Sequence, residues 1–147
     1  MTERTILPYR FAPMRGCGVT YDALLRDRKP CAISEIIIQG DKSEAGRIGF
    51  YATPMGTAVE ASLSSLPFLS EDYEPCFLEI EEKRNSRYRN ITANLPPIFT
   101  RCGEGRITFL TDRFSARDVI GKRITVNKNG NIIASGVIFG ADRSEDD

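Results

Sequence analysis

The sequence predicts an all-β fold, a barrel or sandwich of about seven short antiparallel strands. Segments in which apolar and polar residues alternate recur along the chain and are separated by turn residues, as in half-buried strands. No two of these segments are joined by a helix of crossover length, which argues against a parallel sheet. Asn129 and Gly130 lie between two alternating segments and predict a type I′ hairpin turn, because both residues tolerate the positive φ angles it requires.

The prediction divides the chain into three parts. Residues 1–30 are interrupted by prolines and glycines and show little periodicity, which predicts an irregular N-terminal arm. Residues 31–140 carry the alternating segments and form the predicted barrel. Residues 141–147 are mostly charged and predict a frayed tail.

Strands are predicted at 31–38, 47–53, 57–64, 77–82, 107–110, 123–128 and 131–138, the first from its isoleucines and most of the others from alternation. The last two strands should pair as a hairpin around the Asn-Gly turn. Residues 64–74 and most of 83–100 are predicted as loops, since both contain proline and little alternation. Residues 114–120 predict a short helical turn that ends at Gly121.

The composition argues against several classes of function. Lysine plus arginine number 20 and aspartate plus glutamate number 20, and this zero net charge argues against a nucleic-acid-binding surface or a polybasic membrane anchor. The chain has no histidine, which removes the Ser-His-Asp triad, a histidine base and histidine-ligated metals. Neither a signal peptide nor a membrane-spanning stretch is evident. We therefore expect a cytoplasmic protein of one domain with no nucleic-acid and no membrane partner.

The four cysteines are Cys17, Cys31, Cys76 and Cys102. They are widely spaced and form no Cys-x-x-Cys motif, which argues against a zinc ribbon or a thioredoxin-like site. In a cytoplasmic protein they are expected to be reduced structural thiols.

Four short motifs resemble, in the same order, those of one family. Residues 94–99 read Asn-Leu-Pro-Pro-Ile-Phe, 109–114 read Phe-Leu-Thr-Asp-Arg-Phe, 119–122 read Val-Ile-Gly-Lys and 134–138 read Ala-Ser-Gly-Val-Ile. They are similar to the D-L-P-P-[IL]-F, F-[YL]-T-D-R-F, I-I-G-K and A-C-G-V-I motifs of the bacterial copper–zinc superoxide dismutases. The resemblance covers roughly residues 31–139 and implies an eight-stranded Greek-key β-barrel, in agreement with the strand pattern.

The positions that carry metal ligands in that family hold other residues here. Glu79 and Glu81 stand where the family has two copper histidines, and Asn127 stands where it has the last one. Ile91 replaces a zinc histidine and Asn94 replaces the zinc aspartate. Dismutation needs a redox-active copper held by nitrogen ligands. The resemblance therefore implies a protein without catalytic residues, without a metal and without a cofactor.

Three further family features are also missing. Ile132 stands where the family has an active-site basic residue, and the steering loop before it is replaced by the Asn-Gly turn. Ser135 replaces a disulfide cysteine that ties down the loop at residues 64–74. That loop should then be mobile and held only by packing of its apolar residues, Leu66, Phe68 and Leu69.

What remains is a barrel that would act as a protein-binding or structural module. Its protein partner is unknown, and the first candidate is a second copy of the chain, since the last strand at residues 136–139 is apolar enough for a homodimer interface.

Glu79 and Glu81 leave two alternatives open. Together with Asn94 and Asn127 they could hold calcium, magnesium or manganese, giving a superoxide dismutase or metal-binding protein with residual or altered chemistry. The two carboxylates, about 6.6 Å apart at Cα, could also be the acid and base of a glycosidase, but no aromatic sugar platform accompanies them. The simplest interpretation is two solvated carboxylates on the wet face of a strand.

Overall fold

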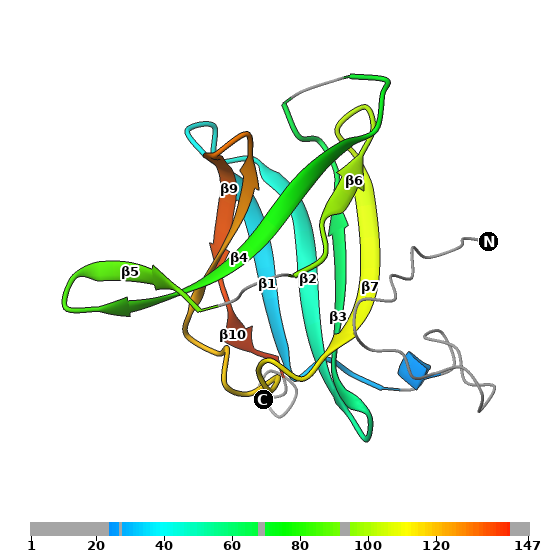
Figure 1. Cartoon of the computed structure of the whole chain (residues 1–147), viewed down its shortest axis with the longest axis vertical. Coiled ribbons are helices and arrows are strands. Elements are labelled where there is room, and N and C mark those ends of the chain that lie inside the picture. The colour runs from blue at the N-terminus through cyan, green and yellow to red at the C-terminus, as the bar shows by residue number, and fades with distance from the viewer. Residues whose placement is uncertain (1–23, 27, 68–69, 92–94, 142–147) are drawn as a thin grey trace.

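A computed structural model describes residues 24–26, 28–67, 70–91 and 95–141. Ten β-strands make up almost all of its regular structure (Figure 1). Their bounds are β1 Ala32–Ile38, β2 Glu44–Thr53, β3 Gly56–Leu63, β4 Glu74–Arg84, β5 Arg87–Asn90, β6 Ile98–Thr100, β7 Gly105–Thr111, β8 Arg123–Lys128, β9 Asn131–Val137 and β10 Phe139–Gly140. The predicted all-β fold is confirmed. Most of the predicted arm and nearly all of the predicted tail lie outside the described residues.

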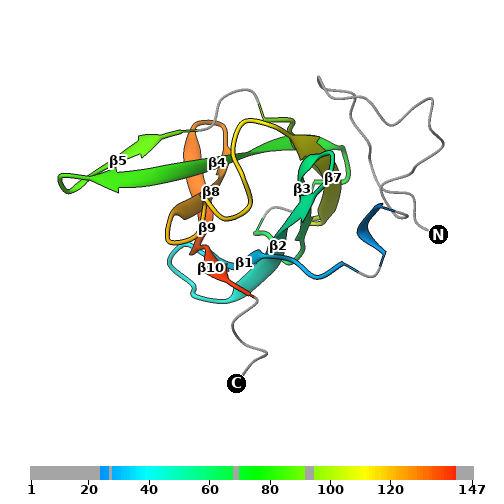
Figure 2. The same ribbon diagram turned by 90° about the horizontal axis from the view of Figure 1, so that it is seen from below.

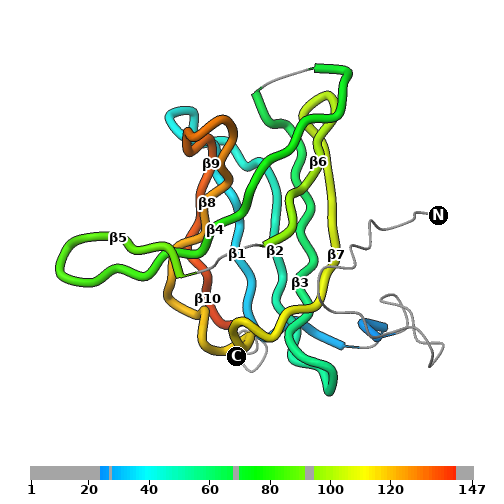
Figure 3. The backbone as a smooth tube through the Cα atoms, in the orientation of Figure 1, coloured from blue at the N-terminus to red at the C-terminus, as the bar shows by residue number. Residues whose placement is uncertain are grey.

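The strands form an antiparallel sheet in the order β5-β4-β8-β9-β1-β2-β3-β7, with β10 paired to β1 and β6 paired to β4. The sheet curls into a half-barrel, seen from below in Figure 2 and as a backbone tube in Figure 3. The chain crosses over from β3 to β4 and from β7 to β8. These crossovers place β4, β8 and β9 side by side, and these three strands carry Glu79, Asn127 and Ile132.

Alternate residues of each strand point into the half-barrel and form its core. In β1, Ile36 and Ile38 are buried whereas Ile37 between them is only half-buried, as a period of two requires. Phe50 of β2 contacts Phe114 edge to face, with the ring centroids 6.2 Å apart. The largest fully buried side chains are Phe50, Phe109, Ile36, Ile48, Leu63, Ile80, Ile98, Ile107, Ile124 and Ile138.

The predicted Asn-Gly hairpin is confirmed. Asn129 has φ 53° and Gly130 has φ 82°, so both residues adopt the left-handed region of a type I′ turn. Strands β8 and β9 pair on either side of it. The register of this pair shifts after Val126, and as a result Asn127 lies opposite Ile132.

The prediction that residues 83–100 are mostly loop is wrong in its first half. Strand β4 runs on to Arg84 and β5 follows after a two-residue turn. Asn85 has φ 55° and Ser86 has φ 67°, the left-handed pair that a tight hairpin requires. All of β5 is exposed, so it lacks the apolar alternation from which a strand is predicted. This β4–β5 hairpin projects from the barrel (Figures 1 and 2).

The connection between β3 and β4 is also held differently from the prediction. Leu66 is buried as expected, whereas Phe68 and Leu69 lie outside the described residues. Backbone hydrogen bonds add to the packing: the Leu66 amide donates to the Gly103 carbonyl at 3.2 Å, and the Cys102 amide donates to the Ser70 carbonyl at 2.7 Å. The expectation that packing alone holds this loop is therefore wrong.

The region after β7 forms successive turns rather than a regular helix. Amide-to-carbonyl bonds three residues apart join Asp118 to Ser115 at 3.1 Å and Lys122 to Val119 at 3.0 Å. Gly121 ends this region with φ 90°, at the position where the sequence predicted its end.

The described part of the arm packs against a small part of the outer face of the sheet, on β3 and β7. Leu24 and Leu25, the only helical residues in the part of the chain that the structure describes, pack against buried Ala58 and Leu110. The Arg28 guanidinium donates to the Ala52 carbonyl at 3.3 Å. In the described residues no helix is long and apolar enough to cross a membrane.

Candidate functional site

The pairing of β4 with β8 brings three of the predicted site residues to one face of the sheet. Glu79 lies opposite Thr125 and Glu81 opposite Arg123, while Asn127 is the next outward residue of β8. Because side chains alternate along a strand, Glu79, Glu81 and Asn127 all point to the outer face. This is the face on which the sequence placed a candidate metal site.

Glu81 is paired with a cation of the protein itself. The Arg123 Nε atom donates to Glu81 Oε1 at 3.0 Å, and a second guanidinium nitrogen lies 3.0 Å from the same oxygen. The Glu81 side chain is 14% exposed and the Arg123 side chain 29%. The Tyr88 ring of β5 lies against the guanidinium, with its centroid 4.2 Å from the Arg123 central carbon. A metal ion at Glu81 would have to displace this guanidinium, which occupies the place a cation would take.

Asn127 is engaged as well. Its amide nitrogen donates to Thr125 Oγ1 at 2.9 Å, and Ile132 lies opposite it on β9. On the next row, Ser135 lies opposite Thr125, and its hydroxyl donates at 3.5 Å to the side-chain carbonyl of Gln39. The surroundings of Asn127 are therefore those of a hydrogen-bonded sheet face rather than of a converging ligand set.

The remaining predicted positions are not brought to this face. Ile91 packs against the hydrophobic core, and its amide donates to the Ile80 carbonyl at 2.9 Å. Asn94 lies outside the described residues. Among the described residues no group of three or more histidine, cysteine, aspartate or glutamate side chains is arranged to hold a metal ion. The residues present do not fit copper or zinc, which prefer nitrogen and sulfur ligands.

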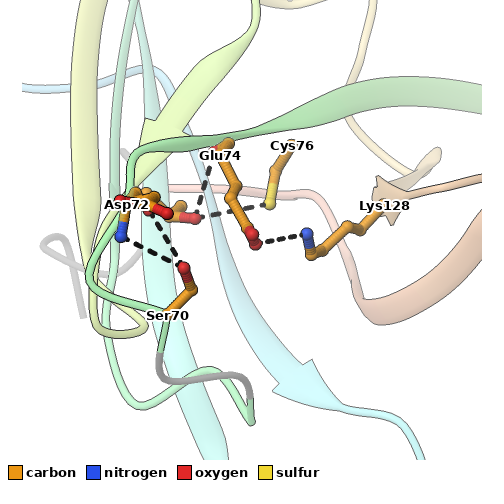
Figure 4. Close-up of polar contacts among 6 residues, drawn as sticks. Ser70, Asp72, Glu74, Cys76 and Lys128 are labelled. Carbon is orange, nitrogen blue, oxygen red and sulfur yellow. Dashed lines mark hydrogen bonds and ion pairs between the residues drawn. The ribbon is translucent and has the colours of Figure 1, made fainter.

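A second polar cluster, which the sequence did not predict, lies where β4 and β6 meet the β8–β9 hairpin. Lys128 Nζ donates to Glu74 Oε1 at 2.6 Å, and the Thr100 hydroxyl donates to the Glu74 carbonyl at 3.2 Å. Cys76 Sγ lies 3.9 Å from Thr100 Oγ1. Figure 4 shows these contacts beside the Ser70 hydroxyl, which binds the backbone of Asp72.

The chemistry of this cluster is structural. The hydrogen bond from Lys128 lowers the pKa of Glu74 below its ordinary value, and burial raises the pKa of the Cys76 thiol. A buried thiol with a raised pKa is a poor nucleophile and a poor metal ligand, because the thiolate is the reactive form. No sequence motif predicts the ion pair of Glu74 with Lys128, because only the crossovers of the sheet bring these two residues together.

Comparison with known proteins adds no relative. No protein-family model matches the sequence, and a search of curated proteins finds no match either. The resemblance to superoxide dismutases therefore depends on the four short motifs.

Proposed function

We propose that this chain is a non-catalytic relative of the bacterial copper–zinc superoxide dismutases, acting in the cytoplasm as a metal-free protein-binding or structural module. The all-β half-barrel supports this proposal, since it agrees with the fold that the motifs imply. The chemistry of the outer face supports the loss of activity.

The observation that carries the proposal is the ion pair between Glu81 and Arg123 at 3.0 Å. Dismutation of superoxide requires a copper ion that changes its oxidation state, together with a positive field that attracts a small anion. At this position the Glu81 carboxylate neutralises the positive charge of Arg123, and the Tyr88 ring lies against the guanidinium. The position is therefore neutral and filled by the chain's own side chains.

The proposal includes self-association through the end of the last strands. Val137 is 62% exposed and Phe139 is 47% exposed, and Phe139 lies opposite half-buried Ile33 of β1. Exposed apolar side chains two residues apart on one face are suited to a twofold interface. Ile138 between them is fully buried in the core, so only two of the four residues in the predicted segment are available to a partner.

Metal titration followed by a dismutase assay tests the loss of activity. The full chain is titrated with copper and with zinc by calorimetry and then assayed for superoxide consumption. We expect no binding tighter than that of unstructured surface carboxylates and no activity. Stoichiometric binding that Glu79→Gln, Glu81→Gln or Asn127→Ala abolishes would instead favour a protein with altered metal chemistry at these residues.

Sedimentation equilibrium tests the self-association. We expect a dimer that Val137→Asp converts to monomer, because a charge would be buried against an apolar partner surface. Met55→Asp is the matched control, since Met55 is an exposed apolar residue at the β2–β3 turn, 39% exposed. A wild-type chain that stays monomeric at high concentration would contradict the proposed interface.

A further inference from the structure

The outer face of the sheet carries a row of arginines away from the site described above. Arg47 of β2 lies opposite Ser62 of β3, and Ser62 lies opposite Arg106 of β7. Two adjoining hollows, of about 500 and 580 Å³, open over this row and share Ser62 and Arg106 in their lining. We call this surface the arginine groove, lined by Arg47, Ser62, Arg106, Arg101, Tyr73 and Phe99.

The positive charges of the arginine groove are largely available to a ligand. Neither Arg101 nor Arg106 makes an ion pair within the described part of the chain. Arg47 lies 3.9 Å from Glu35, but both side chains are at least half exposed, and pairs of that kind contribute little. Two carboxylates also line the groove. Glu60 already accepts a hydrogen bond from the Tyr51 hydroxyl at 3.1 Å, and Glu104 is exposed to solvent, so the three arginines leave the lining with a net positive charge.

One end of the arginine groove is aromatic. Tyr73 is 66% exposed and Phe99 is 48% exposed. The Arg101 guanidinium lies 5.5 Å from the Tyr73 ring centroid, which holds the charge beside the apolar surface. A ligand for this surface needs anionic groups for the arginines and an apolar group for the two rings.

We propose that the arginine groove binds an extended, acidic polypeptide segment that carries an aliphatic or aromatic side chain beside its acidic residues. This inference rests on the proposed protein-binding role and names the chemistry of the partner. Arg47 and Arg106 are two strand spacings apart, roughly 10 Å, and alternate residues of an extended peptide are roughly 7 Å apart. Two flexible arginine side chains close the remaining gap, so acidic residues at positions i and i+2 reach both guanidinium groups.

Fluorescence polarisation with the full-length protein tests the proposal. The probe is a labelled eight-residue peptide with glutamates at alternate positions and one phenylalanine at its end, and the same peptide with glutamines is the control probe. We expect saturable binding of the acidic probe, loss of binding with the glutamine probe, and weakening as salt screens the charges. Arg106→Ala should weaken binding about tenfold, as expected for loss of a charge-assisted contact.

Matched variants keep the outcome decisive. Arg117→Ala removes an exposed arginine of the β7–β8 connection, outside the groove, and should leave binding unchanged. Equal weakening by Arg106→Ala and Arg117→Ala would overturn the location. Tighter binding of a single-stranded oligothymidine than of the peptide would overturn the peptide as the ligand.

The acidic residues at 142–147 of the chain itself call for one more variant in this experiment. Binding of the probe only after Glu145→Gln, Asp146→Asn and Asp147→Asn are combined in the full chain would assign the groove to the protein's own tail and overturn an external partner. Absence of binding alongside a Val137-dependent dimer would reject the groove and leave the proposed function standing. Stoichiometric copper binding with activity would reject the proposed function whatever the peptide does.

Discussion

Removal of the Arg123 guanidinium should cost more stability than removal of any other charge on the outer face of β4 and β8. The substitution Arg123→Met keeps most of the apolar length and removes the charge. It leaves the Glu81 carboxylate, whose side chain is only 14% exposed, without its partner at 3.0 Å. It also removes the cation beneath the Tyr88 ring.

The magnitude follows from the burial of the pair. Removing one partner of a fully buried pair costs about 3–5 kcal/mol, whereas an exposed pair contributes about 0–1 kcal/mol. With exposures of 14% and 29%, the pair lies between these limits, and we expect a loss of about 2 kcal/mol. The contact with Tyr88 adds about 0.5–1 kcal/mol, typical of a cation over an aromatic ring.

Urea denaturation of a double-mutant cycle measures this energy. The cycle combines Arg123→Met with Glu81→Gln, and the expected coupling is about 1.5–2 kcal/mol. Arg84→Met is the matched control, because Arg84 lies 3.5 Å from Glu82 with its side chain 60% exposed. That control should cost about 0.5 kcal/mol or less. A coupling below about 0.5 kcal/mol at Glu81 and Arg123 would refute the argument that the chain neutralises this position by itself.

Three further predictions follow from other parts of the barrel. Ser34→Ala should stabilise the protein by about 1 kcal/mol in urea denaturation, since the Ser34 hydroxyl is buried without a hydrogen-bond partner in the described residues. Glu74→Gln should flatten the acidic side of the plot of unfolding free energy against pH. The hydrogen bond from Lys128 lowers the pKa of Glu74 in the folded state below 4.5. The stabilisation by ionised Glu74 is therefore present above about pH 4.5 and is lost as the pH falls through the lowered pKa. Hydrogen exchange at residues 64–74 should be faster than in the core strands, except at the amides of Ser64 and Leu66, which donate to the carbonyls of Ala45 and Gly103.

Each of these predictions has a control within the chain. Ser43→Ala removes an exposed hydroxyl and should change the free energy of unfolding by less than about 0.5 kcal/mol. If Ser34→Ala changed it by no more than Ser43→Ala, the cost assigned to burying the Ser34 hydroxyl would be contradicted. Glu44→Gln removes an exposed carboxylate of β2 and should leave the acid limb in place, and an unchanged limb for Glu74→Gln would reject the role of Lys128. Exchange throughout residues 64–74 as slow as in β1 would reject the loop prediction.

Local chemistry predicted the elements that depend on neighbouring residues. The Asn-Gly pair fixed its own turn because both residues accept positive φ. Strands with one buried face, such as β2 and β3, were predicted from the alternation of apolar and polar residues. Strand β5 escaped prediction because all four of its side chains are exposed and polar or aromatic, so no burial pattern marks it.

Contacts between distant strands escaped prediction for a different reason. The sequence placed Glu79 and Glu81 correctly on one outward face, but it did not show that Arg123 lies opposite Glu81. That pairing depends on the register between two strands some forty residues apart, which the β7–β8 crossover sets. The arginine groove depends on register in the same way, since Arg47, Ser62 and Arg106 come from three strands.

The metal content of the purified chain tests the central claim most directly. The protein is expressed in cells supplemented with copper and zinc, purified without chelators, and measured by elemental mass spectrometry before and after dialysis. We predict copper and zinc well below one equivalent per chain in both samples, because Arg123 fills the place of a cation at Glu81 and the apolar Ile91, which packs against the core, offers no ligand atom. One tightly held copper or zinc per chain after dialysis would contradict the account.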